Sequence, residues 1–170
     1  MPSSPVSFLI TTVSLCLLLI ALAASFSVVS NTILRDSTRT QLTEVADRVA
    51  GVITELRVLL HMSNEESCTL VKTLNLPKEV LLMGYTVSIE ETDDMYFVVA
   101  SLDMDRSVSG RSALWSKYDE VGVTLDNGTF ATEEFSVNYV CEIHSGEANP
   151  LAWVRRTQSE VSVGLGVVGG

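Results

Sequence analysis

The side chains of this sequence that could take part in acid–base or metal chemistry are few and scattered. Only two histidines occur among its 170 residues, His61 and His144. His144 follows Cys141 and Glu142 in the stretch CEIHSGE, and thiolate, carboxylate and imidazole groups all bind zinc. No second group of ligands at a zinc-site spacing accompanies this stretch, so we predict no metal site. His61 falls at the end of a predicted helix, where the helix dipole favours a charged imidazole and a structural role.

Two acidic stretches carry oxygen ligands of the kind that calcium prefers, EETDD at 90–94 and LDMDRS at 102–107. Neither has the glycine-containing spacing of known calcium loops, so we interpret both as solvated turns. The sequence also lacks a phosphate loop, a dinucleotide fingerprint and a nucleophile elbow. We therefore predict a protein that is not an enzyme, with no catalytic residue, no cofactor and no metal.

The three cysteines leave one candidate pair. Cys16 lies in an apolar segment, where it acts as a small hydrophobic residue. Cys68 and Cys141 are both in the remainder of the chain, and a disulfide between them would close a loop of roughly 70 residues, worth about 4 kcal/mol. Two unrelated buried thiols are the alternative. A disulfide would be favoured in an extracytoplasmic domain.

Asn127-Gly128-Thr129 is an acceptor sequence for N-glycosylation. Asn-Gly is also the pair that a tight hairpin turn selects, so the same residues predict an exposed turn. We take Asn127 as a glycosylation candidate, which favours an extracytoplasmic location.

The net charge of the chain is −10, with only 11 basic residues. Such a surface repels phosphate backbones, so nucleic acid is not an expected partner.

The elements that must position these residues begin with an apolar segment. From Val6 to Ser30 the chain has 25 uncharged residues, of which 14 are Val, Leu, Ile or Phe. As a helix this stretch would span about 37 Å, more than the hydrocarbon core of a bilayer. We assign residues 1–34 to an apolar helix in a membrane or in the core of a filament.

Three interpretations of this segment compete. A secretory signal cut after Ala23 fits its length, but the n-region MPSSPVS has no basic residue. A permanent anchor is the second, although Arg35 and Arg39 would then place the following domain in the cytoplasm by the positive-inside rule. The third is a helix that packs against copies of itself, because the pairs Ala21/Ser25 and Ala23/Ser27 permit close helix approach.

Residues 35–62 continue as an amphipathic helix. Its apolar positions step by three and four, as one face of a helix requires, at Leu42, Val45, Ala46, Val49, Ile53, Leu56 and Leu60. No proline occurs between residues 6 and 76, so one helix from about Val6 to Met62 is expected, with its second half docked on the domain that follows.

Residues 63–170 follow a two-residue period typical of strands. GYTVSIE and MYFVVASL flank the turn ETDD and predict a hairpin. VGVTL and TFATEEFSVNYVCEI predict a second hairpin around Asp126-Asn127-Gly128. Strands are also expected at LAWVRR and SEVSVGLGVV, the latter as a closing strand or as one donated to a neighbouring subunit. The fold class is α+β, a long helix packed on an antiparallel β-sandwich of about six to eight strands.

This layout resembles the archaeal type IV pilin-like proteins, including archaellins and FlaF- and FlaG-like archaellum components. The residues that carry the resemblance are SFLITTVSLCLLLIALAASFSVV, the continuation LTEVADRVAGVITELRVLL and the β-rich remainder. Members usually have a basic leader before the apolar helix, and MPSSPVS is not one. A misplaced start codon or an uncleaved, anchored member would account for that difference.

The resemblance implies a structural subunit of an extracellular filament or of its envelope-spanning base. Its partners would be copies of itself or other pilin-like subunits, the membrane and the cell wall layer, with the β-domain extracytoplasmic. The alternative is a monomeric, membrane-anchored β-sandwich that binds a ligand or protein near Trp115, Tyr118 and Trp153. A secreted soluble domain is a third hypothesis.

Overall fold

A computed structural model describes residues 5–63, 65, 67–119, 121–131, 136–157 and 160–168, with side chains from Phe8 onward. Residues 1–4 of the N-terminal sequence MPSSPVS lie outside this range. The chain forms two compact units, Met1–Ser37 and Thr38–Gly170. The second unit, called the head below, therefore contains helical residues as well as all the strands.

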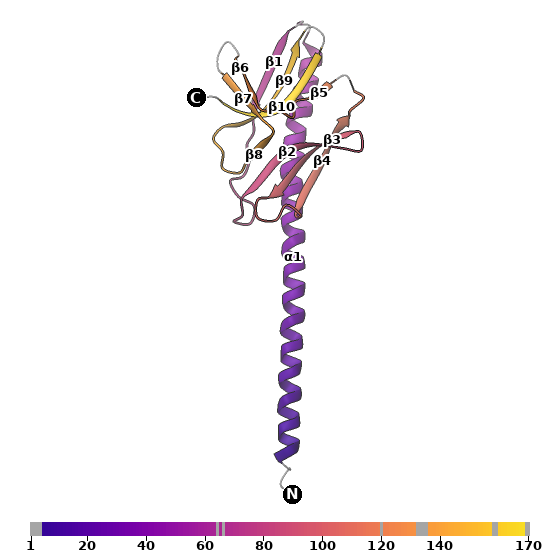
Figure 1. Cartoon of the computed structure of the whole chain (residues 1–170), viewed down its shortest axis with the longest axis vertical. Helices are drawn as coiled ribbons and strands as arrows, with labels where there is room; N and C mark the ends of the chain where they lie inside the picture. Colours follow the sequence, from indigo (N-terminus) through magenta and orange to yellow (C-terminus); the bar gives the residue numbers. More distant parts are fainter. Residues whose placement is uncertain are drawn as a thin grey trace. The chain divides into compact units, whose positions relative to one another are not determined.

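The helix α1 runs from Pro5 to Met62, as its uninterrupted helical pattern predicts. It begins at a proline, whose fixed φ suits the first turn of a helix, and it ends before the strand-forming residues that follow. In the head, all seven apolar positions predicted for its inner face are buried, with exposed fractions of 0 to 5%. The amphipathic pattern is thus confirmed, and this part of α1 is an integral piece of the head (Figure 1).

Strands of the head form two sheets. The larger sheet has the order β1-β9-β10-β7-β6, with β5 also paired to β10. Its strands are β1 Cys68–Thr73, β5 Val121–Val123, β6 Gly128–Ala131, β7 Ser136–Val140, β9 Pro150–Thr157 and β10 Glu160–Val168. All its pairs are antiparallel except β5 with β10, which is parallel.

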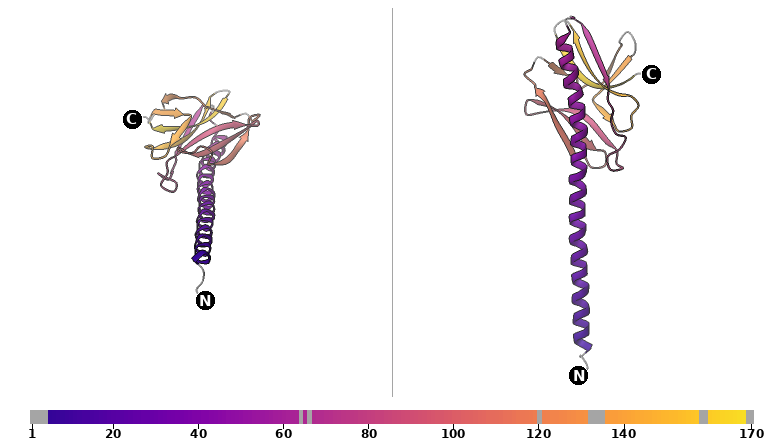
Figure 2. Two further views of the ribbon diagram at one scale, coloured as in Figure 1. Left: turned by 60° about the horizontal axis from the view of Figure 1, so that its bottom comes forward. Right: turned by 180° about the vertical axis from the view of Figure 1, so that it is seen from behind.

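The smaller sheet has the order β4-β3-β2-β8 and is antiparallel throughout. Its strands are β2 Tyr85–Thr92, β3 Met95–Leu102, β4 Ser109–Ser116 and β8 Glu142–His144. β2 and β3 form the predicted hairpin around Asp93 and Asp94. Figure 2 shows both sheets lying against the helical part of the head, which confirms the α+β class.

One hydrophobic core joins the helix to both sheets. It includes Ile53 from α1, Val98 from β3 and Val163 from β10. Gly110 on β4 is where the helix approaches closest, because a Cβ there would lie 2.1 Å from the backbone nitrogen of Thr43. Only glycine permits this contact between strand and helix backbones.

Tyr85 is the largest fully buried side chain of this core. Its hydroxyl donates a hydrogen bond to the carbonyl of Pro77 over 2.5 Å. Burial raises the pKa of Tyr85 to about 12, and the nearby positive charge of Arg48 opposes this shift. The phenol is therefore held in its neutral form.

One prediction about strand pairing is corrected by the structure, and the prediction of a closing C-terminal strand is confirmed. The predicted hairpin around Asp126-Asn127-Gly128 is wrong, since β5 pairs with β10 and β6 pairs with β7. Residues 132–135, in the stretch between β6 and β7, lie outside the described residues. The C-terminal stretch forms β10 between β9 and β7 of its own chain, a closing role in the sheet and not a strand free for donation.

Candidate functional site

The exposed surface of α1 in the unit Met1–Ser37 is the strongest candidate for a functional site. Every Val, Leu, Ile and Phe from Phe8 to Leu34 is exposed, with exposed fractions of 50 to 76%. Large contiguous apolar surfaces of this kind mark contact with a membrane or with another protein. These side chains are Phe8, Leu9, Ile10, Val13, Leu15, Leu17, Leu18, Leu19, Ile20, Leu22, Phe26, Val28, Val29, Ile33 and Leu34.

By its length and composition, the helix is long and apolar enough to cross a membrane. Its hydroxyl groups fit such an environment. Thr12 donates to the carbonyl of Phe8, Ser25 to that of Ala21 and Thr32 to that of Val28, at 2.8–3.0 Å. Because these bonds lie within the helix, the hydroxyls need no partner from water or lipid.

The four small residues predicted for helix packing are exposed on this segment. Ala21 and Ser25 are one turn apart, and so are Ala23 and Ser27. Since Ala23 follows Ala21 by two residues, or about 200° around the axis, the two pairs lie on nearly opposite faces. A helix with small residues on two faces can be approached closely from two sides.

The cysteine pair receives no support from the structure, which leaves Cys68 and Cys141 as free thiols. Cys68 begins β1 and Cys141 directly follows β7, so β9 and β10 lie between them in the sheet. Three strand spacings amount to about 14 Å, whereas a disulfide needs Cα atoms closer than about 7 Å.

Asn127 is exposed, as a glycosylation site requires. Its Oδ1 accepts a hydrogen bond from the backbone nitrogen of Cys141 over 2.8 Å, which orients the side chain. Glycosylation itself stays a prediction.

The two histidines lie apart from each other. His61 is exposed in the last turn of α1. His144 lies on β8, where Nδ1 is 2.9 Å from Oγ1 of Thr86 and the backbone nitrogen donates to Glu147. Among the described residues, no group of three or more His, Cys, Asp or Glu side chains is placed to hold a metal ion.

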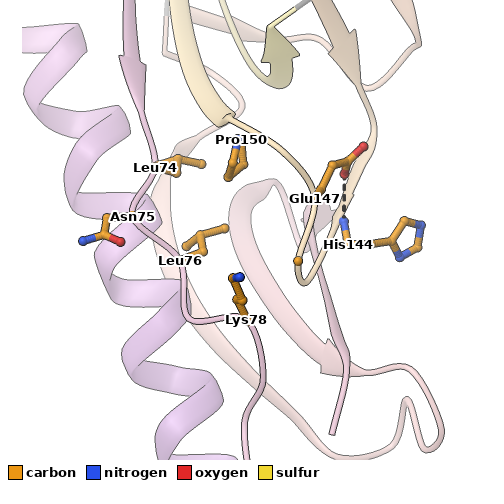
Figure 3. A pocket seen from close by; sticks show the side chains of 8 residues that line it. Leu74, Asn75, Leu76, Lys78, His144, Glu147 and Pro150 are labelled. Atoms are coloured by element: carbon orange, nitrogen blue, oxygen red, sulfur yellow. Dashed lines mark hydrogen bonds between the residues drawn. The ribbon is translucent and has the colours of Figure 1, made fainter.

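A small pocket of about 120 Å³ lies beside His144. Figure 3 shows that its apolar lining comes from Leu74, Leu76 and Pro150 and that the imidazole of His144 points away from these side chains. The pocket therefore offers no convergent set of reactive groups.

The acidic turn at 90–94 is held by ion pairs and hydrogen bonds. Nζ of Lys117 lies 2.6 Å from Oε1 of Glu91, and this hydrogen bond raises the pKa of Lys117. The hydroxyl of Tyr118 donates to Asp94 over 3.1 Å. These contacts give the carboxylates a structural role.

The aromatic residues considered for a binding face do not gather on one surface. Trp115 is buried in the main core, where its Nε1 donates to the carbonyl of Val121. Trp153 belongs to a second cluster with Phe130 and Tyr139. Tyr118 is 80% exposed. The three residues do not form a joint ligand site.

A basic cleft of about 390 Å³ in the head was not predicted from the sequence. It is lined by Arg39, Thr43, Ser107, Ser109, Gly110 and Arg111. Residues from the helix and from the start of β4 meet there only because Gly110 allows contact, and no local pattern signals that approach.

No protein-family model matches the chain, and no curated protein and no solved structure matches it either.

Proposed function

We propose that this protein is a membrane-anchored, pilin-like structural subunit that associates with like helices through the apolar part of α1. The observation that carries the proposal is the complete exposure of the apolar side chains from Phe8 to Leu34. In water this surface would drive aggregation, so lipid tails or neighbouring helices must cover it. The head supplies a folded domain outside the bilayer.

The small residues support self-association in addition to anchoring. Without a hydrophobic driving force in lipid, helices associate through close packing at small residues. Ala21/Ser25 and Ala23/Ser27 offer two such places on nearly opposite faces. One face suffices for a dimer, whereas an assembly that continues beyond a dimer needs both.

The function is structural in this proposal. Most large apolar side chains of the head pack in its core, and the described residues hold no group of His, Cys, Asp and Glu side chains placed to bind a metal ion. An extracytoplasmic location for the head belongs to the same proposal, although Arg35 and Arg39 follow the apolar segment and favour the opposite orientation.

The test is self-association of the full-length chain in detergent micelles and in lipid nanodiscs, measured by energy transfer between labelled copies. We expect Ala23→Leu to weaken association several-fold, because the larger side chain prevents close helix approach. Ala24→Leu is the matched control, because exposed Ala24 lies about 80° around the axis from both small-residue pairs, so this change should leave association unchanged.

Association that is identical in wild type and Ala23→Leu would contradict packing through this face. A chain that stays monomeric in lipid under all conditions would favour the alternative of a monomeric anchored module. Ala21→Leu then distinguishes a dimer from a larger assembly, since it alters the opposite face.

A further inference from the structure

Two turns of the head have similar backbone conformations but opposite chemistry. Asp93 and Asp94 join β2 to β3 with φ of 51° and 62°, and Leu81 and Leu82 have φ of 49° and 66°. Two positive φ angles are the mark of a type I′ turn, which selects Asn, Asp or Gly. Aspartate tolerates this conformation, whereas a bulky leucine is disfavoured there by steric contact.

The leucine turn is fixed by its own hydrogen bonds. Val80 and Met83 form a bridge, with each backbone nitrogen donating to the other's carbonyl at 2.9 and 3.0 Å. Leu82 is 90% exposed and Leu81 is 41% exposed. Two leucines here add backbone strain and little burial, so the stability of the head does not explain them. Exposed large apolar side chains in a strained turn mark a candidate contact surface.

A third large apolar side chain lies close to this turn. The backbone nitrogen of Asp103 donates to the carbonyl of Gly84 over 3.1 Å, which places the loop after β3 beside the leucine turn. Met104 in that loop is 88% exposed. Leu81, Leu82 and Met104 are thus exposed apolar side chains on two neighbouring loops, and these three residues are called the apolar rim below.

The basic cleft lies next to the same loop. Ser107 and Ser109 line it, and Nε of Arg39 donates to the carbonyl of Ser109 over 3.3 Å. Arg111 completes the lining, and its guanidinium also lies 3.9 Å from Oε2 of Glu90, a half-exposed carboxylate that does not line the cleft. Guanidinium and hydroxyl groups together bind phosphate well.

The rim and the cleft mark one end of the head, and the aspartate turn lies at the other. β2 and β4 begin at the first end (Figure 1), and the hydrogen bond from Arg39 to Ser109 places Arg39 beside the start of β4. At the far end Asp119 pairs with Arg57, 3.4 Å apart. The 18 residues from Arg39 to Arg57 correspond to about 27 Å of helix.

We propose that the first end of the head docks on the phospholipid bilayer, with the apolar rim in the interface and Arg39 and Arg111 on lipid phosphates. This inference rests on the membrane anchoring of the proposed function. Arg39 follows Leu34 by five residues, and five residues reach at most about 18 Å, so the chain keeps this end near the membrane surface. Leucine and methionine side chains are favourable at the boundary between headgroups and acyl chains, and arginine side chains can bind the lipid phosphates just outside that boundary.

The experiment uses the full-length chain in nanodiscs of phosphatidylcholine with a quarter of phosphatidylglycerol, loaded with at most one chain per disc. Cys16→Ala, Cys68→Ala and Cys141→Ser remove the native thiols, and a polarity-sensitive fluorophore is attached through Leu82→Cys. We expect a blue-shifted emission and strong quenching by lipids that carry a quencher near the headgroup. The matched control is Tyr118→Cys, an exposed position at the far end, where neither effect should occur.

A label at Leu18→Cys separates the two hypotheses. Quenching of this label by lipids with a mid-chain quencher shows that the apolar helix is in the bilayer. If this label is quenched while the label at position 82 behaves like the one at position 118, docking is refuted and anchoring stands. If the label at position 18 is not quenched, both proposals fail. A blue shift at position 82 without lipid quenching would assign the rim to a protein contact and would also refute docking.

Two variants test the parts of the surface separately, with the label moved to Met104→Cys. Leu81→Asn with Leu82→Gly gives the turn the residues that its backbone prefers, so the head should unfold at a higher denaturant concentration. Because the two leucines are removed from the interface, the lipid quencher should no longer quench the label. Arg111→Gln should weaken the docked state about fivefold. Unchanged quenching in both variants would contradict the assignment.

Discussion

The helix α1 has one backbone conformation in two different environments. From Phe8 to Leu34 its apolar side chains are exposed around the whole circumference. From Thr38 to Met62 most of its apolar side chains gather on one face, where residues such as Val49 and Ile53 are completely buried in the core of the head. Only Val58, Leu59 and Met62 among the large apolar side chains of this part are exposed. The same side-chain types thus stabilise the head in one segment and are available to lipid or other subunits in the other.

This difference shows why helix formation alone does not reveal the role of a segment. Periodicity distinguishes the two parts of the helix. Where apolar residues occupy one face and charged residues the others, the pattern predicts that the apolar face packs against the same chain. A helix that is apolar around its whole circumference is predicted to contact lipid or another subunit. Substitutions should therefore affect the stability of the head in the second segment and the membrane or assembly properties in the first.

The largest expected effect is at Gly110, where β4 meets the covered segment. Gly110→Ala places a methyl group 2.1 Å from the backbone of Thr43, so helix and strand must separate. We expect a loss of about 4 kcal/mol or more in the free energy of unfolding. Urea unfolding of the full-length chain in detergent, followed by tryptophan fluorescence, measures it.

Gly51→Ala is the matched control, because no atom lies within 4 Å of the Cβ it would add. This change on the exposed side of the helix should stabilise the protein by about 0.5–1 kcal/mol. Equal destabilisation by both changes would contradict the close contact at Gly110.

A matched pair of truncations compares the two segments directly. Ile53→Ala leaves a cavity in the core and should cost about 3–4 kcal/mol. Leu18→Ala should change the stability of the head by less than about 0.5 kcal/mol, because Leu18 is an exposed residue of the other unit. Similar losses for both variants, measured by the same urea unfolding, would show that the segments are not independent.

A smaller effect is expected from pH, through Tyr85 in the covered core. Because its pKa is raised from 10.0 to about 12, the folded state holds the phenolic proton more tightly than the unfolded state. The stabilisation is complete below pH 10 and is lost as the pH rises to 12, about 2–3 kcal/mol in all. Unfolding curves at pH 9 to 12 measure it.

Tyr85→Phe should remove this component of the pH dependence. The variant is less stable at neutral pH, since the carbonyl of Pro77 loses its donor. A pH profile identical to that of the wild type would show that Tyr85 does not titrate differently in the two states.

The parts of the fold that follow local rules could be predicted from the sequence. The buried stripe of α1 and the β2–β3 hairpin follow from periods of 3.6 and 2 and from an acidic turn. The parallel pairing of β5 with β10 could not, because it joins segments about 40 residues apart and no local pattern records such a contact. The predicted Cys68–Cys141 pair illustrates the same limit, since two intervening strands separate residues that a count of thiols had paired.

The candidate sites divide in the same way. The apolar helix is visible in the sequence because its composition alone sets it apart. The apolar rim is not, since Leu81-Leu82 is the opposite of a turn signal and only the φ angles reveal the turn. The basic cleft could not be predicted either, because it depends on the close approach of Thr43 on α1 to Gly110 on β4, two residues that are far apart in the sequence.

The position of β10 has a consequence for the order in which the protein is made. This strand pairs with β9, β7 and β5, yet it follows all three in the chain. During synthesis the apolar helix leaves the ribosome first, so a membrane can receive it while the larger sheet still lacks its centre. Until residues 160–168 emerge, β9 and β7 have no strand to connect them. The head therefore completes its larger sheet only after the N-terminal segment has already had time to reach the membrane.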